Sequence, residues 1–147
     1  MRSQTYAKSL PMPMVIRAIK RLEMIRSMPE LRENLWAVVK GLQSGLVNAG
    51  FNIGVTQSPV TPVYMSGGII EATNLILDLR ENYSIFCSMV IYPVVPKGDI
   101  LLRLIPTSMH NLDDVKLTID AFTKCRTKLE SGEYCTESIQ DISALKV

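Results

Sequence analysis

The chain has 147 residues, of which 47% are hydrophobic and 20% are charged, so it is long enough and apolar enough to form one domain with a buried core. The net charge is +2 without a cluster of lysine and arginine, which argues against a nucleic-acid-binding surface. A single histidine and three cysteines without metal-ligand spacing are too few groups for a zinc site or a histidine-based triad, so we expect no metal ion.

No targeting or membrane signal is recognised in the sequence. The opening residues lack the apolar segment of a secretory signal peptide, and no apolar run approaches the roughly 20 residues that span a bilayer. We therefore expect a cytoplasmic protein without a transmembrane segment, in which Cys87, Cys125 and Cys135 are reduced thiols.

The N-terminal half has the pattern of two helices followed by two short strands. Apolar spacing predicts helices at residues 14–26 and 29–49 and strands at residues 51–53 and 60–65. Ser27 is the predicted capping residue of the second helix, and Gly50 is its predicted stop. Pro62 favours an edge position for the second strand, because proline cannot donate to a neighbouring strand.

The C-terminal half alternates between helices and strands. The predicted elements are a helix at residues 69–81, strands at residues 85–92 and 100–105, and a last helix that begins after residue 111 and extends past residue 122. Asn111 is the predicted cap of that helix, with Asp114 at its third position. The apolar, β-prone run Ile85–Tyr92 is expected to be a buried strand.

The order of the elements indicates a fold of the α/β class in an α+β arrangement. We expect helices packed on one face of a small, mainly antiparallel sheet. Residues 13–130 form the predicted domain, and residues 131–147 form a weakly patterned tail.

Arg103 is the most informative single residue, because it interrupts the apolar strand Leu101–Ile105. A guanidinium in a buried strand needs an anion, and its planar fork suits a carboxylate. The anion is either that of a ligand or an internal Asp or Glu in a structural ion pair, and the sequence alone favours the ion pair.

Three further features are weaker. Lys8 and Ser9 lie beside backbone amides that could hold a phosphate, although a solvated terminus is the default. The loop Tyr92–Gly98 is stiffened by two prolines and is expected to form a wall beside the group that Arg103 binds, unless it is an ordinary turn. His110 precedes a helix and is expected to cap or hydrogen-bond rather than to catalyse.

Four segments in order resemble one enzyme family. They are Pro29–Trp36, Ser58–Val63, the YPVVPKG loop at Tyr92–Gly98 followed by Arg103, and Ser108–His110. Together they are similar to the C-terminal domain of the α-oxoamine synthases. These are fold-type-I, pyridoxal-phosphate-dependent acyltransferases that include serine palmitoyltransferase, glycine C-acetyltransferase and 8-amino-7-oxononanoate synthase.

The resemblance implies a cofactor, substrates and a partner. Pyridoxal phosphate would be the cofactor, an amino acid and an acyl-CoA the substrates, and a second copy of the chain the partner in a homodimer. Arg103 would bind the amino-acid carboxylate, and Ala7, Lys8 and Ser9 would lie near the cofactor phosphate. Residues 1–12 would link to a cofactor domain, and the Schiff-base lysine would lie upstream of this chain, so that no catalytic residue lies within it.

The sequence departs from the family pattern at Ile91, where some members have a second arginine. The resemblance favours a serine palmitoyltransferase-like enzyme of sphingolipid biosynthesis that condenses serine or glycine with an acyl-CoA. Glycine C-acetyltransferase and 8-amino-7-oxononanoate synthase are alternatives within the family. An alternative of another class is a non-catalytic interaction module, and in either case we expect the chain alone to be inactive.

Overall fold

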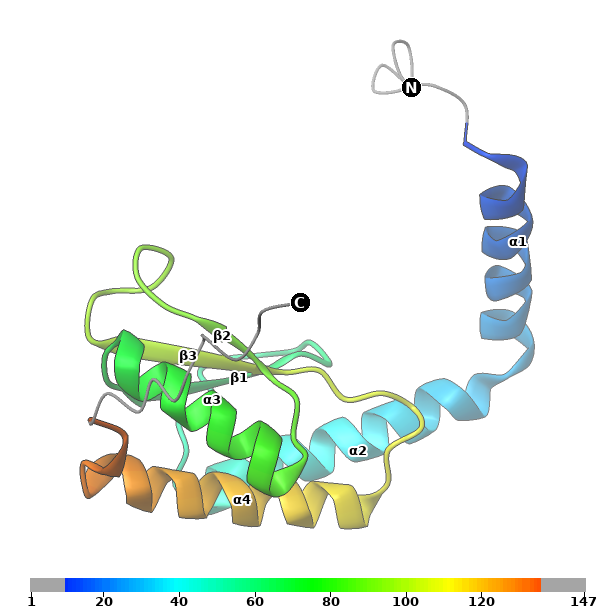
Figure 1. Cartoon of the computed structure of the whole chain (residues 1–147). Helices are drawn as coiled ribbons and strands as arrows, with labels where there is room; N and C mark the ends of the chain where they lie inside the picture. The colour runs from blue at the N-terminus through cyan, green and yellow to red at the C-terminus, as the bar shows by residue number, and fades with distance from the viewer. Residues whose placement is uncertain (1–9, 136–147) are drawn as a thin grey trace.

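The computed structural model describes residues 10–135, which form a three-stranded sheet above a layer of helices (Figure 1). The elements in chain order are α1 (Met12–Ser27), α2 (Pro29–Asn48), β1 (Thr61–Ser66), α3 (Ile69–Tyr83), β2 (Ser88–Val90), β3 (Asp99–Leu104), α4 (Leu112–Glu130) and a short 3-10 turn, η2 (Glu133–Cys135). The predicted arrangement of helices on one face of a small antiparallel sheet is therefore confirmed. None of these helices is both long and apolar enough to cross a membrane.

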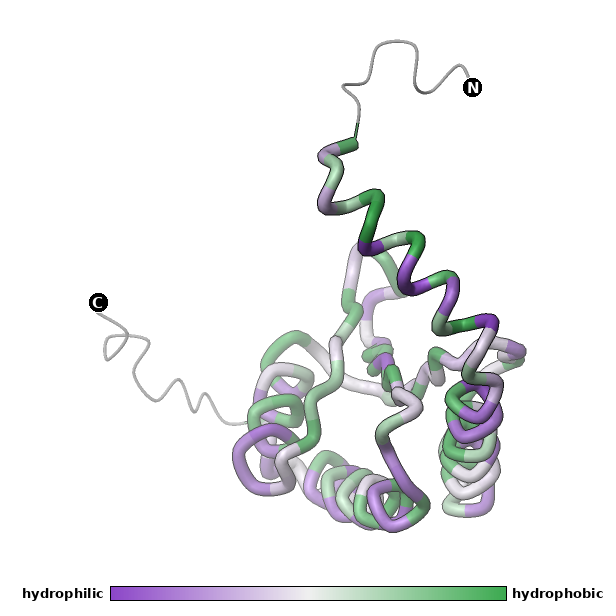
Figure 2. Tube along the Cα trace, turned by 90° about the vertical axis from the view of Figure 1, so that its right-hand side faces the viewer, coloured by the Kyte–Doolittle hydropathy of each residue, from purple (hydrophilic) through white to green (hydrophobic). Residues whose placement is uncertain are grey.

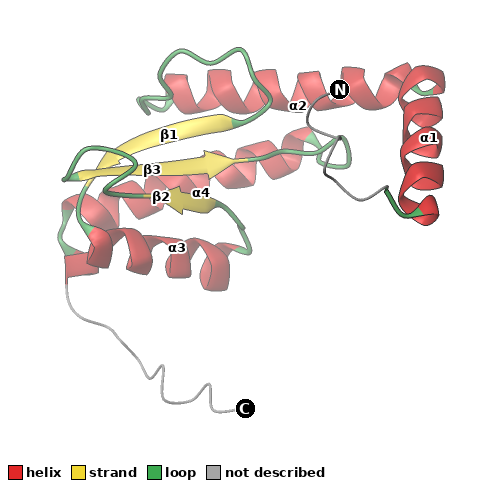
Figure 3. Ribbon diagram, turned by 90° about the horizontal axis from the view of Figure 1, so that it is seen from above, coloured by secondary structure: helices red, strands yellow, loops and turns green. Residues whose placement is uncertain are grey.

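The sheet has the order β1-β3-β2, and both pairs of neighbours are antiparallel (Figure 3). Alternate residues of each strand point to opposite faces, so the register divides the sheet into two chemically different faces. The face toward the helices holds the buried residues Thr61, Val63, Ile100, Leu102 and Leu104. The other face, which we call the open face, holds Pro62, Tyr64, Ser66, Ser88, Val90, Asp99, Leu101 and Arg103.

Two strand predictions differ from the structure. The run Ile85–Tyr92, predicted as a buried strand, is β-structure only at Ser88–Val90, and Phe86 before it is 84% exposed. It lies at the edge of the sheet, where one side of the strand has no neighbour. The predicted strand at residues 51–53 is reduced to a single bridge between Asn52 and Tyr64. Pro62 lies on edge strand β1, as predicted.

The predicted cap of α4 is confirmed. The side chain of Asn111 accepts hydrogen bonds from the backbone amides of Asp113 and Asp114, and Asp114 accepts one in return from the amide of Asn111. The cap predicted at Ser27 is wrong, because Ser27 is the last residue of α1 and its hydroxyl donates to the carbonyl of Met24. Helix α2 begins with Pro29 at its first position, and Met28 makes no side-chain cap.

Close packing between α2 and α4 depends on one glycine. A Cβ atom on Gly45 would lie 2.1 Å from the Cδ1 atom of Ile119, so the absence of a side chain allows the two helices to approach. At the end of this interface Phe122 is fully buried and meets Phe51 edge to face, with the ring centroids 6.0 Å apart. The core therefore lies between α2, α3, α4 and the inner face of the sheet.

Helix α1 extends away from this core and buries none of its residues against it (Figure 2). Most of the apolar side chains that predict the helix are exposed: Ile19, Leu22 and Ile25 are each 49–68% accessible, while Val15 is half-buried. Burial against the sheet therefore does not explain their spacing, and the main contacts of α1 are with α2.

A buried polar cluster joins α3, α4 and η2. The carboxylate of Asp78 accepts hydrogen bonds from Asn82 at 2.6 Å, from Lys128 at 2.7 Å and from the hydroxyl of Tyr134. Burial alone would raise the pKa of Asp78, but these three donors outweigh it and hold that pKa below 3.8. Tyr134 is itself buried, so the first part of the predicted tail packs onto the domain.

Candidate functional site

Arg103 lies near the end of the central strand β3, on the open face of the sheet. Its direct neighbours in register are Pro62 on β1 and Ser88 on β2. The Nε atom of Arg103 donates a hydrogen bond to the Oγ atom of Ser88 at 3.1 Å. Strands on both sides therefore fix where the arginine side chain begins, while the guanidinium faces away from the helices.

The expected burial of Arg103 is wrong, because its side chain is exposed on the open face. Alternation along β3 explains the error. Leu102 and Leu104 point into the core, while Leu101 and Arg103 point outward, and an apolar residue at position 101 makes both faces look buried in the sequence.

The ion pair that the sequence favoured for Arg103 is not formed within residues 10–135. The ion pairs of this part of the chain join Lys20 to Glu23, Arg80 to Glu81, Lys116 to Asp113 and Lys128 to Asp78. The guanidinium thus has a serine hydroxyl as its partner and no carboxylate among these residues. This arrangement leaves its positive charge available for an external anion.

The surroundings of Arg103 on the open face are largely apolar. Leu101 and Val90 form one cross-strand pair beside it, and Tyr64 lies opposite Leu101 on the other side. Exposed apolar groups next to a cation exclude water when a further surface or ligand covers them, and this strengthens the electrostatic attraction.

The sheet register gives the position of the proline loop relative to β3. It joins β2 to β3 beside Asp99, whereas Arg103 lies near the other end of β3. The expectation that the loop forms a wall beside the group that Arg103 binds stays a prediction. Tyr92 and Val94 of this loop are 61% and 78% exposed.

His110 has the hydrogen-bonding role expected of it. Its Nδ1 atom accepts from the backbone amide of Thr107 at 2.9 Å, and the carbonyls of Ser108 and His110 accept from the side chain of Asn34 on α2. These contacts fix the turn between β3 and α4.

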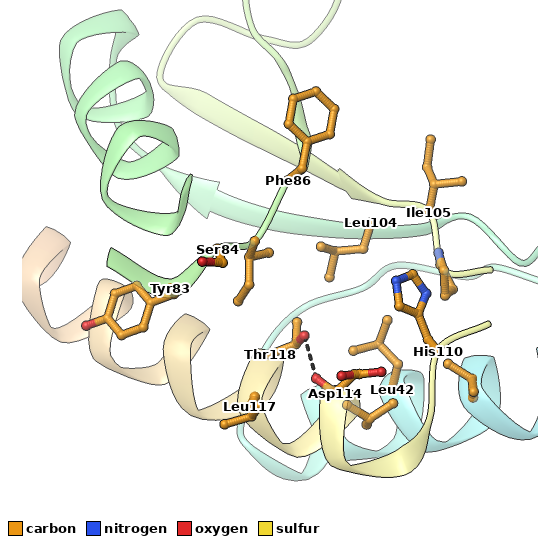
Figure 4. A pocket seen from close by; sticks show the side chains of 14 residues that line it. Leu42, Tyr83, Ser84, Phe86, Leu104, Ile105, His110, Asp114, Leu117 and Thr118 are labelled. Carbon is orange, nitrogen blue, oxygen red and sulfur yellow. Dashed lines mark hydrogen bonds between the residues drawn. The ribbon is translucent and has the colours of Figure 1, made fainter. Parts of the chain in front are cut away.

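His110 also lines an apolar pocket of about 510 Å³ between the ends of α3, β3 and α4 (Figure 4). Leu42, Leu104 and Val115 supply its apolar wall, and Thr118 lies on the α4 side. Arg103 does not line this pocket, because Arg103 is on the opposite face of the sheet. The pocket and the arginine are therefore separate features.

The remaining predicted site residues have different outcomes. Ala7, Lys8 and Ser9 lie outside the described residues. Within residues 10–135, no group of three His, Cys, Asp or Glu side chains is placed to hold a metal ion.

Ser88, which the sequence analysis did not single out, forms a hydrogen bond with Arg103. In the sequence, Ser88 differs from its neighbours as a polar residue within the apolar run Ile85–Tyr92. Only the strand register shows that it faces Arg103.

The sequence has relatives among known proteins. The chain is 55% identical over 134 residues to the cysteate-C-fatty acyltransferase of Capnocytophaga ochracea, covering 91% of the chain and 32% of that protein. It is 30% identical over 128 residues to the 2-amino-3-ketobutyrate coenzyme A ligase of Salmonella typhimurium, covering 87% of the chain and 32% of that protein. No family model matches the chain.

The fold also matches a solved structure. The serine palmitoyltransferase of Sphingomonas wittichii superposes with a TM-score of 0.76 at 23% identity, covering 86% of the chain and 32% of that structure. The chain spans about a third of the length of the curated relatives it matches.

Proposed function

Because the chain belongs to the α-oxoamine synthase family, we propose that it forms the amino-acid-binding side of a pyridoxal-phosphate-dependent acyltransferase. In this class of reaction, a carbon–carbon bond forms between the α-carbon of an amino acid and the acyl carbon of a coenzyme A thioester. The thioester carbon–sulfur bond breaks to release coenzyme A, and the carboxylate leaves as carbon dioxide. Bound pyridoxal phosphate supplies the electron sink for the negative charge at the α-carbon.

One observation carries this proposal: Arg103 projects from the open face of the sheet without a carboxylate partner among residues 10–135. A planar guanidinium binds a carboxylate through two parallel hydrogen bonds, which fix both its position and its orientation. Arg103 would therefore hold the carboxylate of the amino acid. Such a fixed contact at one end of a substrate orients the reacting α-carbon.

Lys128 does not fit the covalent role that the cofactor requires. A lysine that condenses with an aldehyde needs a lowered pKa, so that the neutral amine is populated. Hydrogen bonding to Asp78 instead raises the pKa of Lys128. The family resemblance supports a Schiff-base lysine in a part of the protein outside this chain, and we propose that the chain alone is inactive.

The degree of similarity supports cysteate as the amino acid. Identity is 55% to a cysteate-C-fatty acyltransferase, compared with 30% to a 2-amino-3-ketobutyrate coenzyme A ligase. The favoured reaction is therefore the condensation of cysteate with a long-chain acyl-CoA. The serine palmitoyltransferase-like reaction of serine, which the sequence resemblance favours, is the second candidate.

A panel of substrates tests this proposal in the full-length protein loaded with pyridoxal phosphate. Cysteate, serine and glycine would each be combined with acetyl-CoA and palmitoyl-CoA, and release of the coenzyme A thiol and the product mass would be measured. We expect cysteate with palmitoyl-CoA to react fastest. A preference for serine would overturn the substrate assignment alone, and no thiol release with any pair would overturn the proposed activity.

The family resemblance further supports a cytoplasmic homodimer in which Ala7, Lys8 and Ser9 approach the cofactor phosphate. The molecular mass of the loaded protein in solution tests the dimer. Replacement of Lys8 by Ala would weaken cofactor binding if the assignment of this segment is correct.

A further inference from the structure

We propose that Ser88 is a positioning residue that orients the two terminal nitrogens of Arg103 toward the carboxylate of the amino acid. This inference rests on the proposed role of Arg103 and adds to it a second residue and a binding geometry. Ser88 touches the arginine in the structure, and its effect on the substrate would act through that arginine.

The sheet register places the two side chains together. Ser88 on β2 lies directly opposite Arg103 on β3, so both side chains leave the sheet on the open face. The Oγ atom of Ser88 accepts a hydrogen bond from the Nε atom of Arg103 at 3.1 Å. Both groups are attached to paired strands, which hold side chains more rigidly than loops do.

The contact uses one particular edge of the guanidinium. Arginine binds a carboxylate either side-on, through Nε and one terminal nitrogen, or end-on, through both terminal nitrogens. Because Ser88 occupies Nε, the side-on edge is taken, and the end-on edge with its two terminal nitrogens remains for a ligand. The geometry therefore selects the end-on mode for the incoming acid group.

The serine also restricts the motion of the arginine. The Arg103 side chain is exposed in the described domain, and a long exposed side chain samples several rotamers. A hydrogen bond at Nε limits these rotamers before the substrate arrives, so less conformational freedom is lost on binding. Loss of Ser88 should thus weaken amino-acid binding without altering groups that contact the cofactor.

The test uses the full-length enzyme loaded with pyridoxal phosphate, in which amino-acid binding is followed by the change in cofactor absorbance. For Ser88→Ala we expect the dissociation constant of the amino acid to rise about tenfold, because a single hydrogen bond to a charged group is lost. KM should rise with it, while kcat and the affinity for pyridoxal phosphate stay within about twofold of the unaltered enzyme. Ser88→Thr keeps the hydroxyl and should restore binding.

Ser66→Ala is the matched control, because Ser66 lies on the same open face at the far end of β1, opposite Asp99. It should leave the amino-acid affinity unchanged. Unaltered affinity in Ser88→Ala, or an equal loss in Ser88→Thr and Ser88→Ala, would overturn the inference.

A double substitution separates this inference from the role of Arg103. If Ser88 acts through Arg103, then Ser88→Ala should have no further effect in the Arg103→Leu background. An equal tenfold loss in both backgrounds would show that Ser88 acts independently and would overturn the positioning role. If Arg103→Leu itself leaves amino-acid binding intact, the proposed role of Arg103 is wrong. If only Ser88→Ala leaves binding intact, the role of Arg103 stands and the positioning role of Ser88 is wrong.

Discussion

Tyr134 donates a hydrogen bond to the carboxylate of Asp78, and this contact ties the turn after α4 to the middle of α3. The two residues are 56 positions apart in the sequence. Both side chains are buried, so the hydroxyl and the carboxylate satisfy each other where water does not reach them.

We expect Tyr134→Phe to lower the free energy of unfolding by about 1–3 kcal/mol, because it removes a buried donor to a charged acceptor while keeping the ring. Chemical denaturation of the protein measures this change. Tyr92→Phe, at a tyrosine that is 61% exposed, is the matched control and should change stability by less than about 0.5 kcal/mol. Equal effects of the two substitutions would contradict the contribution of the contact.

The same cluster predicts how stability depends on pH. The pKa of Asp78 is lowered in the folded state, so its contribution is present above the unfolded value near 3.8 and is lost as the pH falls toward the folded pKa. Hydrogen bonding to Asp78 raises the pKa of Lys128, and burial together with Asp78 raises that of Tyr134, so both contributions are lost on the alkaline side. Unfolding free energy should therefore form a plateau that falls at both ends.

Asp78→Asn tests whether Asp78 causes the loss of stability at acidic pH. The variant should be less stable on the plateau, and its loss of stability below about pH 4 should be smaller than that of the unaltered protein. Denaturation measured between pH 2 and pH 11 tests this expectation. If both proteins lost the same amount of unfolding free energy below about pH 4, Asp78 would not titrate as described.

The three cysteines should differ in reactivity. Cys87 and Cys125 are buried and Cys135 is exposed. Burial raises the pKa of Cys87 to about 11 and also raises that of Cys125, so neither thiolate is populated near neutral pH. A thiol reagent at pH 8 should label Cys135 rapidly and the other two only after denaturation. Mass spectrometry of the labelled protein measures this, and rapid labelling of Cys87 would contradict its burial.

Local sequence signals predicted the parts of the fold that depend on neighbouring residues. The cap at Asn111 was predictable because its hydrogen bonds reach only to Asp113 and Asp114. The helix layer and the edge position of Pro62 also followed from spacing and proline chemistry. These features need no knowledge of the tertiary structure.

Features that depend on contacts distant in sequence were missed. The burial of Arg103 was predicted wrongly because Leu101 shares its outward face, so hydrophobicity did not distinguish the two faces of β3. Ser88 became identifiable as its partner only through the register of β2 against β3. Likewise, no local pattern relates Tyr134 to Asp78, because helix packing alone brings them together.

The central claim is that Arg103 binds the carboxylate of the amino-acid substrate. Amino-acid titration of the full-length, cofactor-loaded Arg103→Leu variant tests this claim most directly. Loss of one charge-assisted contact should cost about 2–5 kcal/mol, which raises the dissociation constant by roughly 30-fold or more. Cofactor loading should stay unchanged, and Arg80→Leu, on an exposed part of α3, should bind the amino acid normally. An unchanged amino-acid affinity in Arg103→Leu would contradict the account.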